Sequence, residues 1–153
     1  MSFKKSDIAI QVEKEHECIK RDMRLLEETF AQGEQAEEFA EWRLEYMWRL
    51  RDFRLHLLKH FDLEEEGGFM QEILERAPEV HGKLRQLEME HEKIVTDLDA
   101  ILSALKTMAF RNESKLEGIR SQVLQLLSDI RTHEAAENEL IQTIYCQEYG
   151  YPA

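Results

Sequence analysis

Residues 116–144 read LEGIRSQVLQLLSDIRTHEAAENELIQTI. Apolar side chains recur along this run at alternating steps of three and four residues, which is the period of a helix with one face buried in a bundle. These side chains are Leu116, Ile119, Val123, Leu126, Ile130, Leu140 and Ile144. Between Ile130 and Leu140, His133 and Glu137 take the positions where apolar side chains are due. The run therefore predicts a long helix whose buried face carries two polar side chains.

Three further apolar stripes with the same period precede this one. They consist of Ile8, Val12, Ile19, Met23, Leu26 and Phe30, then Phe39, Trp42, Tyr46, Leu50, Phe53 and Leu57, then Leu84, Leu87, Ile94, Leu98, Ile101 and Leu105. Only 6 glycines and 2 prolines interrupt the chain, which disfavours a sandwich or barrel with its frequent turns. The pattern predicts an all-α fold, an antiparallel up-down-up-down four-helix bundle formed by one domain over residues 1–153.

The ends of these helices have sequence signals of their own. Ser6 is suited to cap the first helix, and Asn112 or Ser114 to cap the last. The Gly67 and Gly68 pair is expected to kink or loosen the second helix, which Pro78 then ends.

Composition excludes several classes of partner. The 20 basic and 32 acidic side chains give a formal net charge of −12, which repels nucleic acid and anionic lipid. The chain has no run of eighteen apolar residues, and Met1 to Lys5 lead directly into charged sequence, so no membrane span is expected. Cys18 and Cys146 are too few for a disulfide framework. We expect a soluble, cytoplasmic protein.

Each of the four stripes has a gap that histidine or glutamate fills. The residues in the gaps are His16 in the first, His60 and Glu64 in the second, His91 in the third, and His133 and Glu137 in the fourth. The pattern E-x-E-H-E-x-I occurs at residues 13–19 and again at 88–94, and H-x-x-x-E occurs twice, 73 residues apart. The chain therefore resembles two related helical hairpins with a pseudo-two-fold site between them.

Helix geometry indicates that these side chains meet. Glu64 and His91 lie thirteen and fourteen residues from a turn expected near Ala77, so an antiparallel pairing puts them at the same height. Four imidazoles and two carboxylates in a core would each cost a few kcal/mol if unpaired. Histidines paired with glutamates in an ordinary interaction bundle would satisfy some of them. Six such groups on one seam favour a site for iron, manganese or zinc, whose ligands they are.

The order His16, His60-x-x-x-Glu64, His91, His133-x-x-x-Glu137 is similar to that of the hemerythrin-like (HHE cation-binding) domains, over essentially the whole chain. The resemblance implies a hemerythrin-like bundle holding two iron ions with a bridging oxo or hydroxo group. It also implies that His16 and His60 serve one iron and His91 and His133 the other, with Glu64 and Glu137 bridging both.

One position departs from the oxygen-carrying hemerythrins, whose third helix supplies two histidines one turn apart. Here Leu87 and Val95 lie one turn from His91, which leaves four histidines. His56 could supply a fifth, although we favour an outer or surface role for it. His81 lies ten residues from His91 and is expected to be exposed.

The expected function is that of a non-haem di-iron protein that binds dioxygen or a related small oxidant. It would act in oxygen or iron sensing, in binding or in redox buffering, with a protein partner receiving any signal. The alternatives are a di-iron enzyme for peroxide reduction, ferrous iron oxidation or nitric oxide handling, and a zinc-stabilised interaction bundle. Two histidines, two bridging carboxylates and one bridging oxygen would leave each iron one open position, which favours irreversible reaction with oxygen over transport.

Overall fold

The structure is a computed structural model that describes residues 5–33 and 35–148. All regular elements in these residues are helical, as the sequence predicts. The long helices are α1 (Asp7–Gly33), α2 (Phe39–Glu65), α4 (His81–Thr107) and α5 (Glu113–Glu148). A short helix α3 (Phe69–Arg76) and a single 3₁₀ turn η1 (Pro78–Val80) connect α2 to α4.

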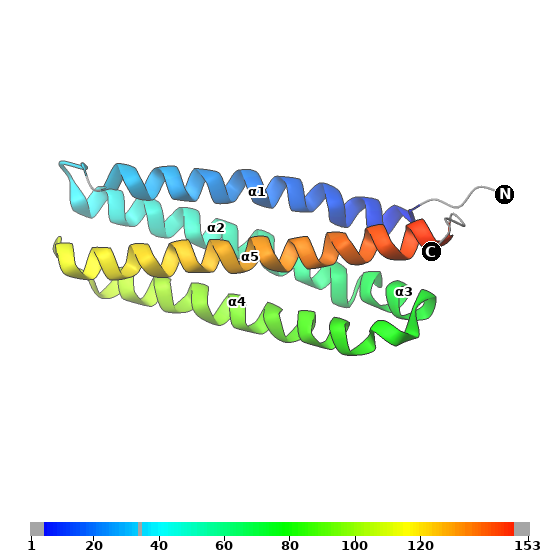
Figure 1. Cartoon of the computed structure of the whole chain (residues 1–153). Helices are drawn as coiled ribbons and strands as arrows, with labels where there is room; N and C mark the ends of the chain where they lie inside the picture. The colour runs from blue at the N-terminus through cyan, green and yellow to red at the C-terminus, as the bar shows by residue number, and fades with distance from the viewer. Residues whose placement is uncertain (1–4, 34, 149–153) are drawn as a thin grey trace.

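The four long helices lie side by side, and each packs against two others (Figure 1). Helix α1 contacts α2 and α5, and α4 contacts the same two helices. The α1–α2 and α4–α5 connections lie at one end of the bundle, whereas α3 lies at the other end (Figure 1). The prediction of a helical bundle built from four long helices is confirmed.

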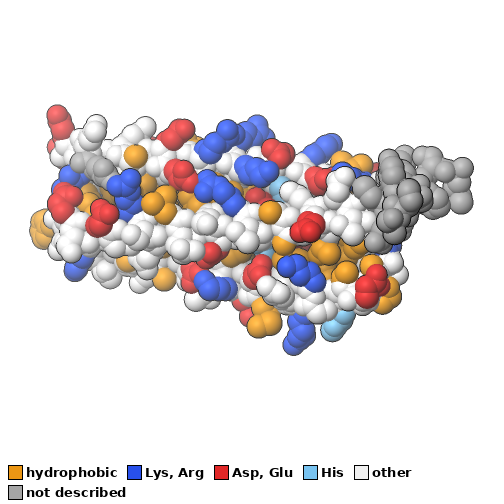
Figure 2. Space-filling model, in the orientation of Figure 1, with side chains coloured by type: hydrophobic (Ala, Val, Ile, Leu, Met, Phe, Trp, Pro, Cys, Tyr) orange, Lys and Arg blue, Asp and Glu red, His pale blue; other side chains and the backbone are white. Residues whose placement is uncertain are grey.

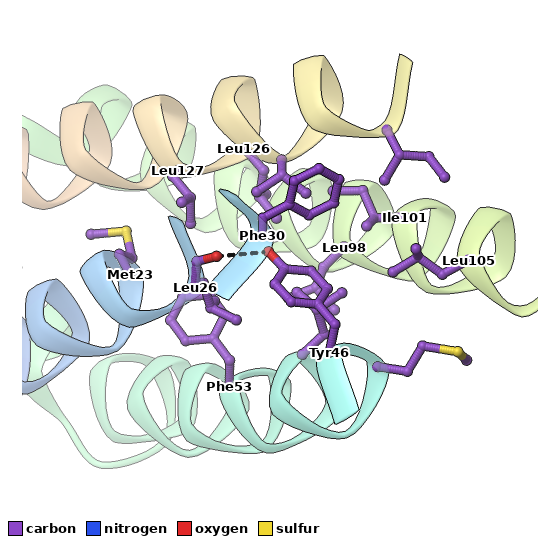
Figure 3. Packing of buried hydrophobic residues seen from close by; sticks show 14 of the residues in the cluster. Met23, Leu26, Phe30, Tyr46, Phe53, Leu98, Ile101, Leu105, Leu126 and Leu127 are labelled. Carbon is purple, nitrogen blue, oxygen red and sulfur yellow. Dashed lines mark hydrogen bonds between the residues drawn. The ribbon is translucent and has the colours of Figure 1, made fainter. Parts of the chain in front are cut away.

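Two apolar cores fill the bundle, one toward each end. The core toward the α1–α2 connection, called here the loop-end core, includes Met23, Phe30, Tyr46, Phe53, Leu98 and Leu126 (Figure 3). The core toward α3, called here the α3-end core, includes Ala9, Val12, Phe69, Ile73, Leu87 and Ile141. His16 lies between Val12 of one core and Ile19 of the other, so the polar gap of each stripe falls where the two cores meet.

Helices α1 and α2 pack closely in the loop-end core, and two aromatic side chains of α2 donate hydrogen bonds to the backbone of α1. Tyr46 donates a hydrogen bond to the Leu26 carbonyl oxygen at 3.1 Å (Figure 3), and Trp42 donates one to the Thr29 carbonyl oxygen at 2.9 Å. The indole ring of Trp42 lies so close to Gly33 that a Cβ at that position would overlap it. Because Gly33 has no side chain, the Trp42 ring can pack directly against the end of α1.

The Gly67–Gly68 pair breaks the second predicted helix instead of kinking it. Gly68 has a φ of +98°, a conformation that side chains of L-residues rarely adopt, and it directly precedes α3. After the break, α3 turns Phe69 and Ile73 into the α3-end core. Pro78 begins the 3₁₀ turn that leads into α4.

The predicted helix starts are confirmed, whereas three residues of the predicted apolar stripes are only partly buried. Ser6 Oγ accepts a hydrogen bond from the Ala9 amide, and Asn112, not Ser114, caps α5 by accepting from the Lys115 amide. Ile8, Phe39 and Leu140 are partly buried and pack against the edges of the cores, while Ile141, next to Leu140, lies in the α3-end core with no exposed surface. Ile141 follows Glu137 by four residues, which places both side chains on the same buried face of α5.

No helix in residues 5–33 and 35–148 is long and apolar enough to cross a membrane. Figure 2 shows acidic and basic side chains interspersed on the face formed by α1, α5 and α4.

Candidate metal centre

The six side chains predicted from the gaps come together between the two apolar cores. His16, His60, His91 and His133 come from α1, α2, α4 and α5 respectively, so each long helix supplies one imidazole. Glu64 lies one turn after His60 on α2, and Glu137 lies one turn after His133 on α5. All six residues are buried, with at most 3% of any one exposed. The predicted level pairing of Glu64 with His91 is confirmed, since His91 Nε2 lies 3.0 Å from Glu64 Oε1.

The ligand-type atoms form two clusters that share both carboxylates. The first cluster contains His16, His60, Glu64 and Glu137, and the second contains Glu64, His91, His133 and Glu137. Within each cluster one atom per residue lies within 4.8 Å of all the others. This is the spacing that a single ion in the middle of each cluster would require.

Each carboxylate directs one oxygen toward each cluster. Glu64 Oε2 lies 3.3 Å from His60 Nε2 in the first cluster, while Oε1 of the same side chain faces His91 in the second. Glu137 Oε1 lies 3.0 Å from His16 Nε2, and its Oε2 lies 3.4 Å from His133 Nε2. This is the arrangement of a carboxylate that bridges two positions.

Several of the nitrogen and oxygen atoms that face the clusters lack hydrogen bonds. Whether an ion would satisfy them tests whether the site fits a metal. Within the described part of the chain, His60 Nε2, both oxygens of Glu64 and Glu137 Oε2 have no hydrogen-bond partner. Nitrogens lie close to these oxygens but without hydrogen-bond geometry. Buried polar atoms of this kind are costly unless something pairs with them. A cation in each cluster would satisfy them, so the residues present fit a two-metal centre.

The outer nitrogen of every histidine is held by a side chain from the neighbouring helix. Each Nδ1 lies within hydrogen-bond distance of an oxygen, in four pairs. The pairs are His16 with Asn138 at 2.8 Å, His60 with Glu15 at 3.0 Å, His91 with Glu65 at 2.9 Å, and His133 with Glu90 at 2.8 Å. These four bonds, called here the outer ring, lead from α1 to α2, α4, α5 and back to α1.

The outer ring determines which nitrogen of each imidazole carries a proton and which nitrogen faces the clusters. Carboxylate and amide oxygens accept hydrogen bonds, so Nδ1 donates in each pair. A neutral imidazole that donates through Nδ1 keeps a lone pair on Nε2, and here Nε2 faces the clusters. All four histidines are thus oriented as metal ligands.

Electrostatics in the metal-free protein favour protons on these imidazoles. Burial alone would lower the pKa of His16, but its hydrogen bond to Glu137 and the nearby carboxylate of Glu64 raise it from 6.5 to about 10. Burial also opposes the charged form of His133, and Glu137 with Glu90 raises its pKa to about 9. The pKa of Glu64 lies well below its ordinary value, against the effect of burial, because the neighbouring Glu137 and the surrounding histidines stabilise its charged form. Without an ion, protons therefore neutralise the clusters.

The four residues that hold the imidazoles in the outer ring were not predicted from the sequence. Glu15 and Glu90 each directly precede a histidine of the repeated E-x-E-H-E-x-I pattern, and each holds the histidine of the next helix. The repeated Glu-His pair was the available signal. Glu65 follows Glu64 directly and Asn138 follows Glu137 directly, so the residue after each H-x-x-x-E pattern has the same role.

The other histidines and the described cysteine lie outside both clusters. His56 is about half exposed, and its Nδ1 lies 3.2 Å from Asp22 Oδ2, which places it at the surface between α2 and α1. His81 is exposed at the start of α4, as predicted. Cys18 is exposed, and the side chain of Cys146 lies outside the described residues.

Comparison with protein-family models, with curated proteins and with solved structures gave no match in any of the three cases.

Proposed function

We propose that this chain is a hemerythrin-like, up-down-up-down bundle that holds two iron ions and binds dioxygen or a related small oxidant. One observation carries the proposal: Glu64 and Glu137 each direct one oxygen into each of two buried clusters, and two histidines complete each cluster. Mixed imidazole and carboxylate donors suit iron. The role would be oxygen or iron sensing, binding or redox buffering.

The course of the chain supports the hemerythrin-like part of the proposal. In Figure 1 successive long helices run back and forth along the bundle, joined by connections at alternate ends. The two halves also match in register, because His16 and His91 are 75 residues apart, while His60 and His133 are 73 apart. Two hairpins related in this way provide two similar positions for an ion.

In the proposal His16 and His60 hold one iron and His91 and His133 hold the other, with Glu64 and Glu137 bridging them. Two iron ions would supply one-electron redox chemistry and a place for a small oxidant to bind, together with an oxo or hydroxo bridge. The side chains of the loop-end and α3-end cores exclude water on both sides. The outer ring keeps each Nε2 directed inward.

Any sensing output would pass to a protein partner, since the bundle itself is occupied by the centre. A cytoplasmic location is part of the same proposal. It is supported by the scarcity of cysteine and by the finding that no described helix could span a membrane.

The test is the metal content and visible spectrum of freshly purified protein, recorded with and without oxygen. The proposal expects two irons per chain and a visible absorption band that responds to oxygen. His81→Ala is a suitable control, because His81 is exposed and outside both clusters. One ion or none under iron-replete conditions would contradict the proposal, and two zinc ions with no visible band would favour a metal-stabilised interaction bundle.

A further inference from the structure

Glu134 is a carboxyl group buried in the interior of the bundle. It lies on α5 directly after His133, and only 2% of it is exposed. Neither of its carboxylate oxygens has a hydrogen-bond partner among the described residues. Burying a carboxylate without a hydrogen-bond donor costs free energy of folding. Glu134 would therefore destabilise the fold if its role were purely structural.

The position of Glu134 associates it with the first cluster. On α5, Glu134 lies one helical turn before Asn138, whose Oδ1 lies 2.8 Å from His16 Nδ1, so the two side chains share the face that α5 directs toward α1. The side chain therefore lies near the atoms that would hold the first ion, just outside the cluster that the other four residues form.

The corresponding position in the other half of the bundle holds an aromatic ring. Glu134 is 73 residues after Phe61, the same separation that relates His133 to His60. Phe61 stacks on the imidazole of His91 with ring centroids 3.9 Å apart, and it approaches His133 edge-on at 6.0 Å. One cluster thus has a carboxyl group where the other has an apolar cover.

We propose that Glu134 is a seventh protein ligand, which coordinates the ion of the first cluster and not the ion of the second. This inference rests on the proposed two-metal centre. Its carboxylate would fill the position that two histidines, two bridging carboxylates and one bridging oxygen leave open on that ion. The first ion then has one more anionic donor than the second, and it binds more tightly.

The second ion keeps its open position, and a groove in the surface reaches the residues that cover the second cluster. A groove of about 590 Å³ lies between α2 and α4, and Leu58, Phe61, Glu65, His91 and Val95 are among its lining residues. His91 is the only one of these residues that belongs to a cluster. We expect a small exogenous ligand to approach the ion held by His91 and His133 from this groove, past the rings of Phe61 and His91.

The experiment is an anaerobic calorimetric titration of metal-free protein with Fe²⁺, comparing the unchanged chain with Glu134→Gln and Glu134→Leu. Glu139→Gln, an exposed glutamate on the same helix, is the matched control. The unchanged chain should bind two ions in two steps of different affinity. Both variants should weaken the tighter step by about tenfold or more, the scale known for changes close to a metal, and leave the weaker step unaltered.

A second measurement separates a ligand from a structural residue. If Glu134 is present for metal binding, Glu134→Leu should keep or raise the melting temperature of the metal-free protein while it weakens Fe²⁺ binding. Two bound ions with unchanged affinities in Glu134→Gln would overturn the assignment of Glu134 alone. A lower melting temperature of metal-free Glu134→Leu with unchanged Fe²⁺ affinities would also overturn it, as a structural role. Failure of the unchanged chain to bind two ions would overturn the two-metal centre itself.

Discussion

Glu65 and Asn138 take corresponding places in the two halves of the bundle, and each holds the outer nitrogen of a histidine on the neighbouring helix. Glu65 faces His91 at 2.9 Å, and Asn138 faces His16 at 2.8 Å. A carboxylate makes the imidazole that it holds a stronger donor than a neutral amide does. The outer ring is therefore asymmetric at this one pair of positions, because the acceptor beside His91 is a carboxylate and the acceptor beside His16 is a neutral amide.

Exchanging the charge at these positions should change metal affinity in opposite directions. Glu65→Gln should weaken binding of the ion at His91, and Asn138→Asp should strengthen binding of the ion at His16, each by up to about tenfold. The affinities can be measured by competition with a chelator of known strength. Glu66→Gln is the control, since Glu66 is also exposed and follows Glu65 directly. A change of the same sign in both variants would contradict this role.

The shared carboxylates should determine how many ions bind. Glu64→Gln and Glu137→Gln keep the size of the side chain but replace one carboxylate oxygen with an amide nitrogen, which cannot bridge. Each variant should bind fewer than two ions, while circular dichroism shows the helices retained because the apolar cores are untouched. Two tightly bound ions in either variant would show that these glutamates do not bridge.

The metal-free protein should lose stability in alkali. The pKa values of His16 and His133 are raised to about 10 and 9 in the folded chain, against 6.5 when unfolded, so their contribution is complete below pH 6.5 and disappears as pH rises through 9 to 10. The pKa of Glu64 is lowered, so its contribution is present above pH 4.5 and is lost as pH falls below it.

Urea denaturation of metal-free protein between pH 4 and pH 10 measures this dependence. The alkaline loss should shrink in His133→Gln, which removes one of the raised groups. Fe²⁺ affinity should show the opposite trend and increase with pH, because the ion must displace protons from the imidazoles. Stability that is equal at pH 6 and pH 10 would show that the imidazoles are not protonated in the fold.

Reaction of the reduced protein with oxygen should be fast and irreversible. With Glu134 as a ligand, the position that a fifth histidine would take on one ion is filled by a carboxylate, and an anionic donor in place of a neutral imidazole favours the oxidised ions. The ion held by His91 and His133 keeps the open position at which the oxidant binds. The measurement is to reduce the protein without air, admit oxygen and follow the visible absorption. A long-lived band that disappears on degassing and returns with oxygen would argue for reversible carriage.

The stripes were sufficient to predict the bundle because apolar periodicity reports directly on which face of a helix is buried. The six residues in the gaps could be predicted for the same reason, since a histidine or glutamate that interrupts an apolar stripe must lie on the buried face. The break at Gly68 was only partly predictable: the glycines show where a helix can bend, but the α3-end core determines whether Phe69 starts a new helix.

Glu134 and the outer ring could not be predicted in the same way. The chain has 32 acidic residues, and a glutamate is exposed by default, so no pattern distinguishes buried Glu134 from exposed Glu139. The burial of Glu134 depends on how closely α5 packs against α1, and the sequence pattern does not report this distance. The partners of Glu15 and Glu90 likewise depend on which helix lies alongside, and sequence spacing does not specify this.

The closed course of the outer ring has a consequence for how the bundle opens. Each long helix carries a histidine held by one neighbour and supplies a group that holds the histidine of the other neighbour. No single helix can swing away without breaking two of these bonds and disturbing both clusters. The middle turns of all four helices should therefore exchange their amide hydrogens as one cooperative unit, and an ion should escape no faster than that unit opens.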